Sequence, residues 1–527
     1  MNGLKLQSLN DMHKLKRMLA NLEDHNSLVM ALSQANIPWL CQLLKTALHN
    51  GASIRTIVCM IEDALERGYW PRGHTAEATD LTLLIYWLGG RSLLFALSRQ
   101  LALPSLRTLR SKMSFVKITL TIGCISIDTI KKNIRDTIAG PHLEAGLMVF
   151  HGVSLLINEM ALEEAAVYLL MANGVGGLCW THSHLIDPTL YNYQSAINIV
   201  TSLKAGKVHL GKEVTVIGAH IFGEDRLYPI LTAPTCKFED TTDMEFVFNT
   251  AISGWQAAGG EEDIGPLWSF ATDGDATHRK AGHRVFLKNQ LPITSLLHST
   301  LSNLPGMNLY TGDGEVTLDF DYKHIIKCFS TCVRGTKGMS LNHGQCISTF
   351  MLECYLPLLD NLDQDVAQRL LYPNDPQDVP HAIKLLSVII AITKVNPVLP
   401  PFTSLGCTPD VNVVADFEAL QVLGFTLESL LEPFINIKLS LSQQVVHLSC
   451  FAHLLYTFYR DQCHHFMPNQ LYYNSQTMVK NAIFSIAKQQ KLDPSSRFSL
   501  LDVGDDALEL TFALLQMSGG HNNAFNY

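Results

Sequence analysis

The chain has 527 residues, of which 47% are hydrophobic and 17% are charged, and its formal net charge is -9. This composition is typical of a large globular protein and excludes an intrinsically disordered chain. The first residues lack a secretory pattern, and the most apolar segment, Leu81 to Leu97, is interrupted by Gly89, Gly90 and Arg91. We therefore expect neither a signal peptide nor a membrane span, and we interpret Leu81 to Leu97 as a buried helix or a helix pair. Twelve cysteines without paired spacing favour reduced thiols in an intracellular protein over a disulfide framework.

Charge is unevenly distributed along the chain. Residues 1–150 contain 17 Lys and Arg against 11 Asp and Glu, whereas the remainder contains 22 against 37. The basic excess is strongest between Arg99 and Arg135. A basic module in front of an acidic body suits a nucleic-acid-binding part joined to a metal-using part. A solvated helix face is the alternative that charge alone leaves open.

The first hundred residues have the apolar spacing of helices. Between Leu94 and Arg110 the pattern breaks at Pro104-Ser105, where Ser105 can cap a second helix. Two short helices around a tight turn, the second one basic, form a candidate helix-turn-helix element. Its candidate DNA-binding residues are Arg107, Arg110, Lys112 and Lys117.

A series of strands is expected between about residues 145 and 275, because apolar and β-branched runs alternate there with glycine turns. The runs are Leu147–Ile157, Gly174–Trp180 (a glycine turn leading into a strand), Val214–Phe222, Tyr228–Ala233 and Leu267–Thr272, and a helix is expected at Asp243–Ala258. Several strands, a helix and a further strand favour an α/β fold with a mixed sheet.

Two of these runs end in carboxylates. The apolar run Leu267–Thr272 stops at Asp273-Gly-Asp275, and Val316–Phe320 stops at Asp321, with His324 three residues later. A rigid strand can hold such a carboxylate over a cleft as a metal ligand. Asp-Gly also marks ordinary turns, so a structural role is the alternative.

Gly206–Lys212 fits the first seven positions of a phosphate-binding P-loop. Glu213 then stands where the metal-binding Ser or Thr is required, and the following residues read as a strand, where a P-loop needs a helix. A hairpin turn is the better interpretation.

From Gly335 to Arg497 the sequence is mostly helical, and a last helix carries Glu509 after a cap at Asp505 or Asp506. Two or three converging carboxylates can hold a pair of divalent ions that activate a hydroxyl for phosphoryl transfer. Oxygen ligands of this kind suit Mg²⁺ or Mn²⁺.

Five blocks of this sequence resemble, in order, those of P-element and THAP-type DNA transposases. They are Leu103–Arg110, Ile157–Met160 followed by Gly177–Trp180, Ala271–Thr277, Asp321–Lys327, and Asp506–Glu509 with Phe512 and Gly519-Gly520. The resemblance covers roughly residues 95–527 and implies an α/β fold: an RNase H-like mixed sheet core interrupted by a large helical insertion, with an α-helical N-terminal domain.

The resemblance also implies a domain organisation. We expect a helical, basic N-terminal domain at 1–140 and the first part of the core at 141–334. A helical insertion is expected at 335–490, and the C-terminal catalytic helix at 491–527 completes the core. The family's guanine-nucleotide dependence is not carried over, because the insertion has no intact nucleotide motif.

The activity that the resemblance implies is Mg²⁺- or Mn²⁺-dependent cleavage and joining of DNA in the nucleus by a DDE-type site. Asp273 would be the second acid and Glu509 the third. Asp321 and His324 would support the metal site, and Asp506 would be an auxiliary acid. The expected partner is DNA, with a homo-oligomer left open.

The first acid position is Asn158. Asn is nearly isosteric with Asp but carries no charge, so two close cations lose Coulomb stabilisation there. Glu159 would point to the opposite face of the strand, so we do not expect it to substitute. Ala513 and Gln516 also depart from the family pattern, and no Cys/His zinc finger precedes the core.

Three hypotheses follow. The first is a transposase-derived, domesticated protein that binds DNA and has lost most of its strand cleavage and transfer. The second is an active Mg²⁺-dependent DDE transposase or nuclease. The third is a non-catalytic helical interaction protein whose acids are only caps and turns.

Overall fold

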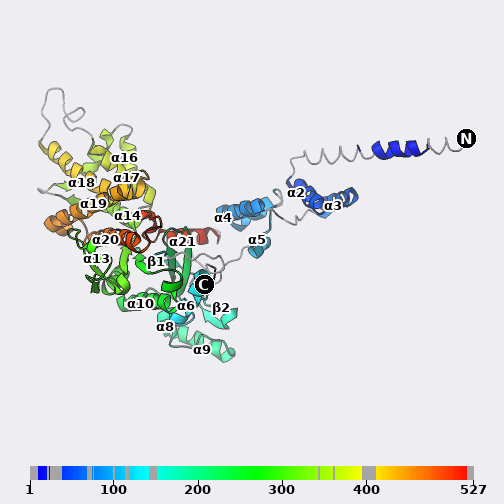
Figure 1. Ribbon diagram of the computed structural model, residues 1–527, viewed down its shortest axis with the longest axis horizontal. Helices are drawn as coiled ribbons and strands as arrows, with labels where there is room; N and C mark the ends of the chain where they lie inside the picture. The colour runs from blue at the N-terminus through cyan, green and yellow to red at the C-terminus, as the bar shows by residue number, and fades with distance from the viewer. Residues whose placement is uncertain are drawn as a thin grey trace, which may run out of the picture. The chain divides into compact units, whose positions relative to one another are not determined.

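The computed structural model describes residues 10–20, 23, 38–67, 74, 76–98, 101, 103–112, 118–141, 151–341, 345–359, 362–394 and 411–518 (Figure 1). The described residues within 1–115, together with the end of the last helix from Ala513, form one compact unit, and those within 116–512 form another.

The first unit is helical. Its helices are α2 (Pro38–His49), α3 (Ile54–Arg67), α4 (Ala76–Ser98) and α5 (Leu106–Lys112). The predicted break before α5 is confirmed, because the Ser105 hydroxyl accepts a hydrogen bond from the Thr108 amide at 3.2 Å. Gly90, at φ 65°, interrupts α4, which agrees with the alternative of a helix pair at 81–97.

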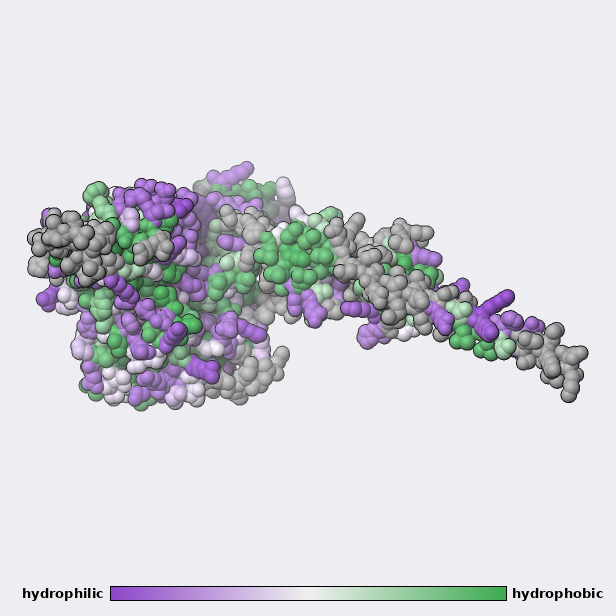
Figure 2. All heavy atoms as spheres, turned by 90° about the horizontal axis from the view of Figure 1, so that it is seen from above, coloured by the Kyte–Doolittle hydropathy of each residue, from purple (hydrophilic) through white to green (hydrophobic). Residues whose placement is uncertain are grey.

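The predicted burial of that apolar segment is wrong in part. Leu88 and Phe95 on α4 are 64% and 72% exposed, and Figure 2 shows this helix as a green, apolar surface. Helix α4 carries apolar side chains on several of its sides. The small core that it forms with Leu103 buries only one of these sides. No helix in the described part of the chain is long and apolar enough to cross a bilayer.

A five-stranded mixed sheet organises the second unit. Its strands are β1 (Val153–Ala161), β4 (Glu213–Ile221), β5 (Leu227–Thr235), β6 (Leu267–Thr272) and β9 (Thr317–Phe320). The spatial order is β5-β4-β1-β6-β9, with β5, β4 and β1 paired antiparallel and β1, β6 and β9 paired parallel. The sheet gives the chain a mixed α/β fold, whereas the third hypothesis expected a helical protein.

Helices cover both faces of the sheet. One face carries α6 (Ile127–Ile134), α10 (Thr241–Ala257) and α12 (Ala276–Phe286), which pack on one another and on side chains such as Phe270 and Leu318. The other face carries α20 (Asn469–Leu492) and the start of α21 (Asp506–Ser518). The helix predicted at 243–258 is confirmed as α10, and its capping box explains its start.

The connection from β1 to β4 forms a small separate layer. It contains β2 (Val167–Leu169), η2 (Leu170–Ala172), β3 (Gly174–Gly176), α8 (Trp180–Ser183) and α9 (Tyr193–Lys204). The strand predicted to end at Trp180 is therefore wrong: Gly177 turns the chain at φ 82°, and Trp180 begins a helix. Gly206–Lys212 joins α9 to β4, which excludes a P-loop but is not the hairpin turn expected there.

Further elements surround this core. Those before residue 341 are η1 (Arg135–Ala139), α11 (Gly260–Asp263), β7 (Asn289–Gln290), α13 (His298–Leu301), β8 (Tyr310–Thr311), η3 (Asp313–Glu315), α14 (Tyr322–Val333) and β10 (Met339–Ser340). Those after it are β11 (Cys346–Ile347), α15 (Thr349–Tyr355), η5 (Leu356–Leu358), α16 (Gln364–Leu371), α17 (Val379–Ile392), α18 (Val411–Ile435), α19 (Leu441–Gln462), η6 (Cys463–His465) and η7 (Leu500–Asp502). Helix α20 packs against β9 and β6, so this late helix belongs to the sheet layer.

A buried lysine joins α20 to the sheet. Lys488 is 2% exposed, and its Nζ donates to the Trp268 carbonyl at 2.5 Å and to the Glu315 carbonyl at 2.8 Å. Burial lowers the pKa of Lys488 from 10.5 to about 7. The unfolded chain therefore binds more protons than the folded one between these values, and the free energy of unfolding rises with pH across this window.

We expect Lys488→Met to flatten this pH dependence. The slope of unfolding free energy between pH 7 and pH 10 should fall by up to about 1.4 kcal/mol per pH unit, because one proton difference disappears. Urea denaturation at several pH values measures it. Lys491→Met, on the exposed side of the same helix, is the control. An unchanged slope in Lys488→Met would contradict the prediction.

Candidate active site: a buried carboxylate cluster

The parallel strands β1, β6 and β9 deliver polar residues to one edge of the sheet. Asn158 lies near the end of β1, while Asp273 and Asp321 directly follow β6 and β9. Asp505, which directly precedes α21, and Glu509 in the first turn of α21 reach the same edge. Asp505 accepts a hydrogen bond from Asn158, and Glu509 interacts electrostatically with Asp321.

The turn before α21 is held by Gly504. Its backbone amide donates to Oδ2 of Asp319 at 2.8 Å, with Gly504 at φ 90°. A Cβ atom at this position would lie 2.9 Å from Oδ1 of Asp321. Only glycine therefore combines this backbone conformation with so close an approach to the strand end.

Asp319 and Asp321 are both buried, although Asp319 lies near the end of β9 and Asp321 directly follows it. Burial raises the pKa of Asp319 to about 7, although the amides of Gly504 and Phe320 donate to it. Asp319 thus has partners for both oxygens and anchors the turn. Its role is structural.

Asp321 differs from Asp319 in having an unpartnered oxygen. It caps α14, and its Oδ2 accepts from the His324 amide at 2.5 Å, but no described residue donates to Oδ1. Burial raises the pKa of Asp321 to about 7, and the nearby carboxylates of Glu509 and Asp506 add to the effect. Such an oxygen is suited to a cation.

Asp505 is the residue that sequence reasoning missed as a site residue. It is fully buried, its Oδ2 accepts from Nδ2 of Asn158 at 3.0 Å, and Oδ1 receives no hydrogen bond from the described residues. Burial raises the pKa of Asp505 well above its ordinary value, followed by repulsion from Asp321, Glu509 and Asp273. The adjacent acids at 505 and 506 were the only signal in the sequence, and a helix cap explained them equally well.

Asp273 is held by a buried histidine. His278 on α12 is 3% exposed, with Nδ1 3.7 Å from Asp273 Oδ1 and Nε2 3.3 Å from Glu159 Oε1. Burial opposes the charge on His278, but the two carboxylates prevail and raise its pKa to about 10. Burial likewise opposes the charge on Asp273, but the nearby His278 and the hydrogen bond from the Asp275 amide hold its pKa at about 2.

The predicted opposite orientation of Glu159 is confirmed. Its Oε1 accepts from the Thr215 hydroxyl at 3.2 Å and contacts His278, whereas Asn158 faces Asp505 and α21. Glu159 therefore supports His278 and lies on the opposite face of the strand from Asn158.

The remaining predicted residues occupy different places. Asp506 forms an ion pair with Lys323, so its charge is already compensated. His324 is half-buried, and burial followed by Lys327 lowers its pKa, while Asp273 acts in the opposite direction. Of the predicted DNA-binding residues, Arg107 is exposed on α5. Arg110 and Lys112 are in α5 with side chains outside the described part, and Lys117 lies outside the described residues.

The cluster is chemically suited to a divalent cation. Asp321 and Asp505 each present one unpartnered, buried oxygen, and Asp273 and Glu509 add carboxylates that interact with them. Buried carboxylates without counter-charge are costly, and hard oxygen ligands are what Mg²⁺ and Mn²⁺ prefer. The donor type therefore suits such an ion, but within the described residues no three of these carboxylates bring their oxygens within 4.8 Å of one another.

Comparison with known proteins gives a likeness of fold. No family model matches the chain, and no curated protein matches its sequence. Among solved structures it is similar to the Drosophila P element transposase strand transfer complex, with a TM-score of 0.50 and 13% sequence identity. The match covers 88% of this chain and 91% of that one. The mixed α/β fold is thus shared over most of both chains.

We expect Asp505→Asn to stabilise the cation-free protein. Removing a buried, incompletely paired charge should raise the free energy of unfolding by about 1–3 kcal/mol. The same variant should lose the stabilisation that millimolar Mg²⁺ or Mn²⁺ gives the wild type. Thermal denaturation with EDTA and with each ion measures both effects.

The matched control is Asp506→Asn, because the neighbouring carboxylate is paired with Lys323. It should not stabilise the cation-free protein. A wild type that no divalent ion stabilises would contradict the assignment of a cation site.

Proposed function

We propose that this chain is a transposase-derived, DNA-binding protein with an RNase H-like core and degenerate strand cleavage. The observation that carries the proposal is the strand order β5-β4-β1-β6-β9, with a carboxylate cluster at the end of its parallel strands. Antiparallel strands followed by two parallel ones are the arrangement expected for an RNase H-like sheet, with acids after the first and fourth strands. The likeness of fold to a P element transposase supports the same relationship.

The proposed ligands of Mg²⁺ or Mn²⁺ are Asp273, Asp321 and Glu509, to which we add Asp505. When bound, such ions activate a water or a sugar hydroxyl and stabilise the leaving oxygen of a phosphodiester. The chain's own contribution is to fix these carboxylates. His278 holds Asp273, the start of α14 holds Asp321, and the Gly504 turn holds α21.

The amide of Asn158 is the physical basis for degenerate cleavage. Its Oδ1 accepts from the Glu159 backbone amide at 2.7 Å, and its Nδ2 donates to Asp505. The reverse orientation would place an amide oxygen against a carboxylate oxygen, so the two partners fix the side chain. Asn158 therefore turns an N–H, and not an oxygen, toward the site, and it occupies one oxygen of Asp505.

One observation favours an active enzyme as the second candidate. Asp505 places a buried carboxylate directly beside Asn158 and keeps one oxygen free of hydrogen bonds from the described residues. It could supply the charge that the first acid position lacks. The cleavage experiment below separates the two candidates.

DNA would bind through phosphate contacts near the cluster. Helix α12 begins three residues after Asp273 and carries Lys280, His283 and Arg284 on its exposed side, with the half-buried Arg279. Cations beside the carboxylates can attract and orient a polyanionic backbone. Helix α5, with Arg107, Arg110 and Lys112, is the second proposed contact.

The remaining elements of the proposal follow from this function. A nuclear location suits a DNA-binding protein, and a homo-oligomer stays an open arrangement. We propose a helical, DNA-binding N-terminal domain that ends before α6, and a helical insertion from about 335 to the start of α20. The boundaries expected at 140 and 490 are corrected because α6 and α20 pack on the sheet and therefore belong to the core.

We expect the wild type to nick supercoiled DNA weakly in Mg²⁺ or Mn²⁺ and Asn158→Asp to nick it at least about tenfold faster. The restored carboxylate adds an oxygen ligand and charge beside Asp505. Gel analysis of nicked and linear plasmid measures the rate.

Asn158→Asp combined with Asp273→Asn is the control, and it should abolish the gain. Fast cleavage by the wild type that Asp273→Asn and Asp505→Asn both remove would contradict degeneracy and favour the active enzyme.

For DNA binding, we expect Lys280→Glu with Arg284→Glu to weaken affinity for duplex DNA and to lower the salt slope by about 1 per lost phosphate contact. Charge reversal at Arg107, Arg110 and Lys112 should act in the same way. Fluorescence anisotropy over a range of salt concentrations measures both. Lys438→Glu, an exposed lysine that follows α18, is the control for net charge. Equal effects of all three charge changes would contradict specific contacts.

A further inference from the structure

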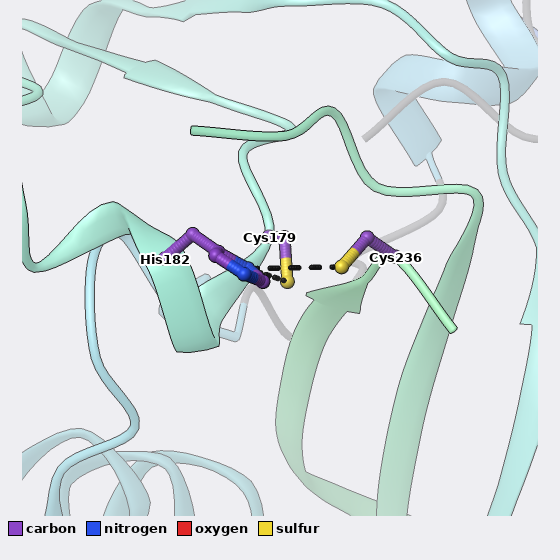
Figure 3. Close-up of side chains that lie close together, drawn as sticks. All are labelled: Cys179, His182 and Cys236. Carbon is purple, nitrogen blue, oxygen red and sulfur yellow. Dashed lines mark hydrogen bonds between the residues drawn. The ribbon is translucent and has the colours of Figure 1, made fainter. Parts of the chain in front are cut away.

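Two cysteines and a histidine come together where the β1–β4 connection meets the end of β5. Cys179 directly precedes α8, His182 lies within α8, and Cys236 directly follows β5 (Figure 3). Their side chains point toward one another, and both cysteines are buried. One potential ligand atom from each residue lies within 4.8 Å of the others.

The spacing of these atoms is that of a tetrahedral zinc site. Nδ1 of His182 lies 3.4 Å from Sγ of Cys179 and 3.7 Å from Sγ of Cys236. With zinc–sulfur bonds of about 2.3 Å and zinc–nitrogen bonds of about 2.0 Å, the sulfur–nitrogen edge of a tetrahedron is about 3.5 Å. The two observed distances lie on either side of this value.

A possible fourth ligand, a carboxylate oxygen, is close by. Oε1 of Glu239 lies 3.2 Å from Sγ of Cys179 and also accepts from the Cys236 amide at 3.0 Å. The Cys179 amide in turn donates to the His209 carbonyl at 2.9 Å, and the His209 ring packs edge-on against His182. The backbone on both sides of the cluster is therefore fixed.

We propose that Cys179, His182 and Cys236 bind one Zn²⁺ ion, with the Glu239 carboxylate as the fourth ligand. Two thiolates and an imidazole select a borderline-soft ion over Mg²⁺ or Mn²⁺, so this site is distinct in chemistry from the carboxylate cluster.

The ion would link the β1–β4 connection to the end of β5 and thereby to the sheet. The apolar cluster of this connection contains only three fully buried residues, Leu178, Ile199 and Val208. So small a core contributes little stability, and a structural metal commonly compensates for this in small modules. The ion therefore stabilises the layer between β1 and β4 and does not take part in cleavage.

Metal analysis of the full-length protein, purified under reducing conditions, tests the proposal. We expect about one zinc per chain, lost in Cys179→Ser, Cys236→Ser and His182→Ala. Glu239→Gln should keep the metal with affinity about 10- to 100-fold weaker. Cys124→Ser and Cys346→Ser, at exposed cysteines, and Asp321→Asn in the carboxylate cluster should keep one zinc.

A measurement on the wild-type protein is needed because a variant could lose zinc simply by misfolding. After removal of zinc by a chelator, Co²⁺ should give the visible absorption of a tetrahedral thiolate complex. Hydrogen exchange of residues 162–212 should slow when Zn²⁺ is returned. Wild-type protein without zinc and without the cobalt spectrum would overturn the proposal. So would a Cys179–Cys236 disulfide under reducing conditions, or zinc retained in both serine variants.

Discussion

The hydrogen bond from the Gly504 amide to Asp319 is the interaction on which the proposed site depends. It joins the turn before α21 to the end of β9, two segments that are 185 residues apart in the chain. Together with the Asn158–Asp505 hydrogen bond and the Lys323–Asp506 ion pair, it fixes Asp505 and Glu509 relative to Asp273 and Asp321. The close approach of Gly504 to Asp321 explains why a side chain at position 504 would disturb the site.

The consequence of this packing is a concentration of negative charge in a buried place. Burial raises the pKa of Asp321 and of Asp505, and each residue keeps an oxygen that receives no hydrogen bond from the described residues. A fold does not gain stability from such an arrangement, since buried carboxylates lose hydration. Protonation, which the raised pKa values favour, or the cation proposed above would compensate for this, and sites of this kind commonly exchange stability for function.

The two neighbours Asn158 and Glu159 show how one strand divides these roles. Successive side chains on a strand point to opposite faces, so Asn158 reaches Asp505 while Glu159 reaches His278. His278, on α12, lies between the carboxylates of Glu159 and Asp273, which raise its pKa. It thereby holds Asp273 in place. The strand therefore presents a carboxylate paired with His278 on one face and an uncharged amide on the other.

The sequence by itself determined the periodic elements and the acids that follow them. The apolar runs at β1, β4, β5, β6 and β9, the helix α10, and Asp273 and Asp321 after their strands were all readable, because period-two patterns and turn residues are local signals. The substitution at Asn158 was also visible there. The exposure of α4 and the helix beginning at Trp180 were not, since burial and chain direction depend on what packs against a segment.

Only the tertiary structure decided which side chains meet. Asp505 looked like an ordinary helix cap until the Gly504 turn placed it against Asn158. Cys236 stands 54 residues after His182, and only the return of β5 to the edge of the β1–β4 connection brings their ligand atoms together. Long-range contacts of this kind are set by packing between distant segments, which leaves no periodic trace in the sequence.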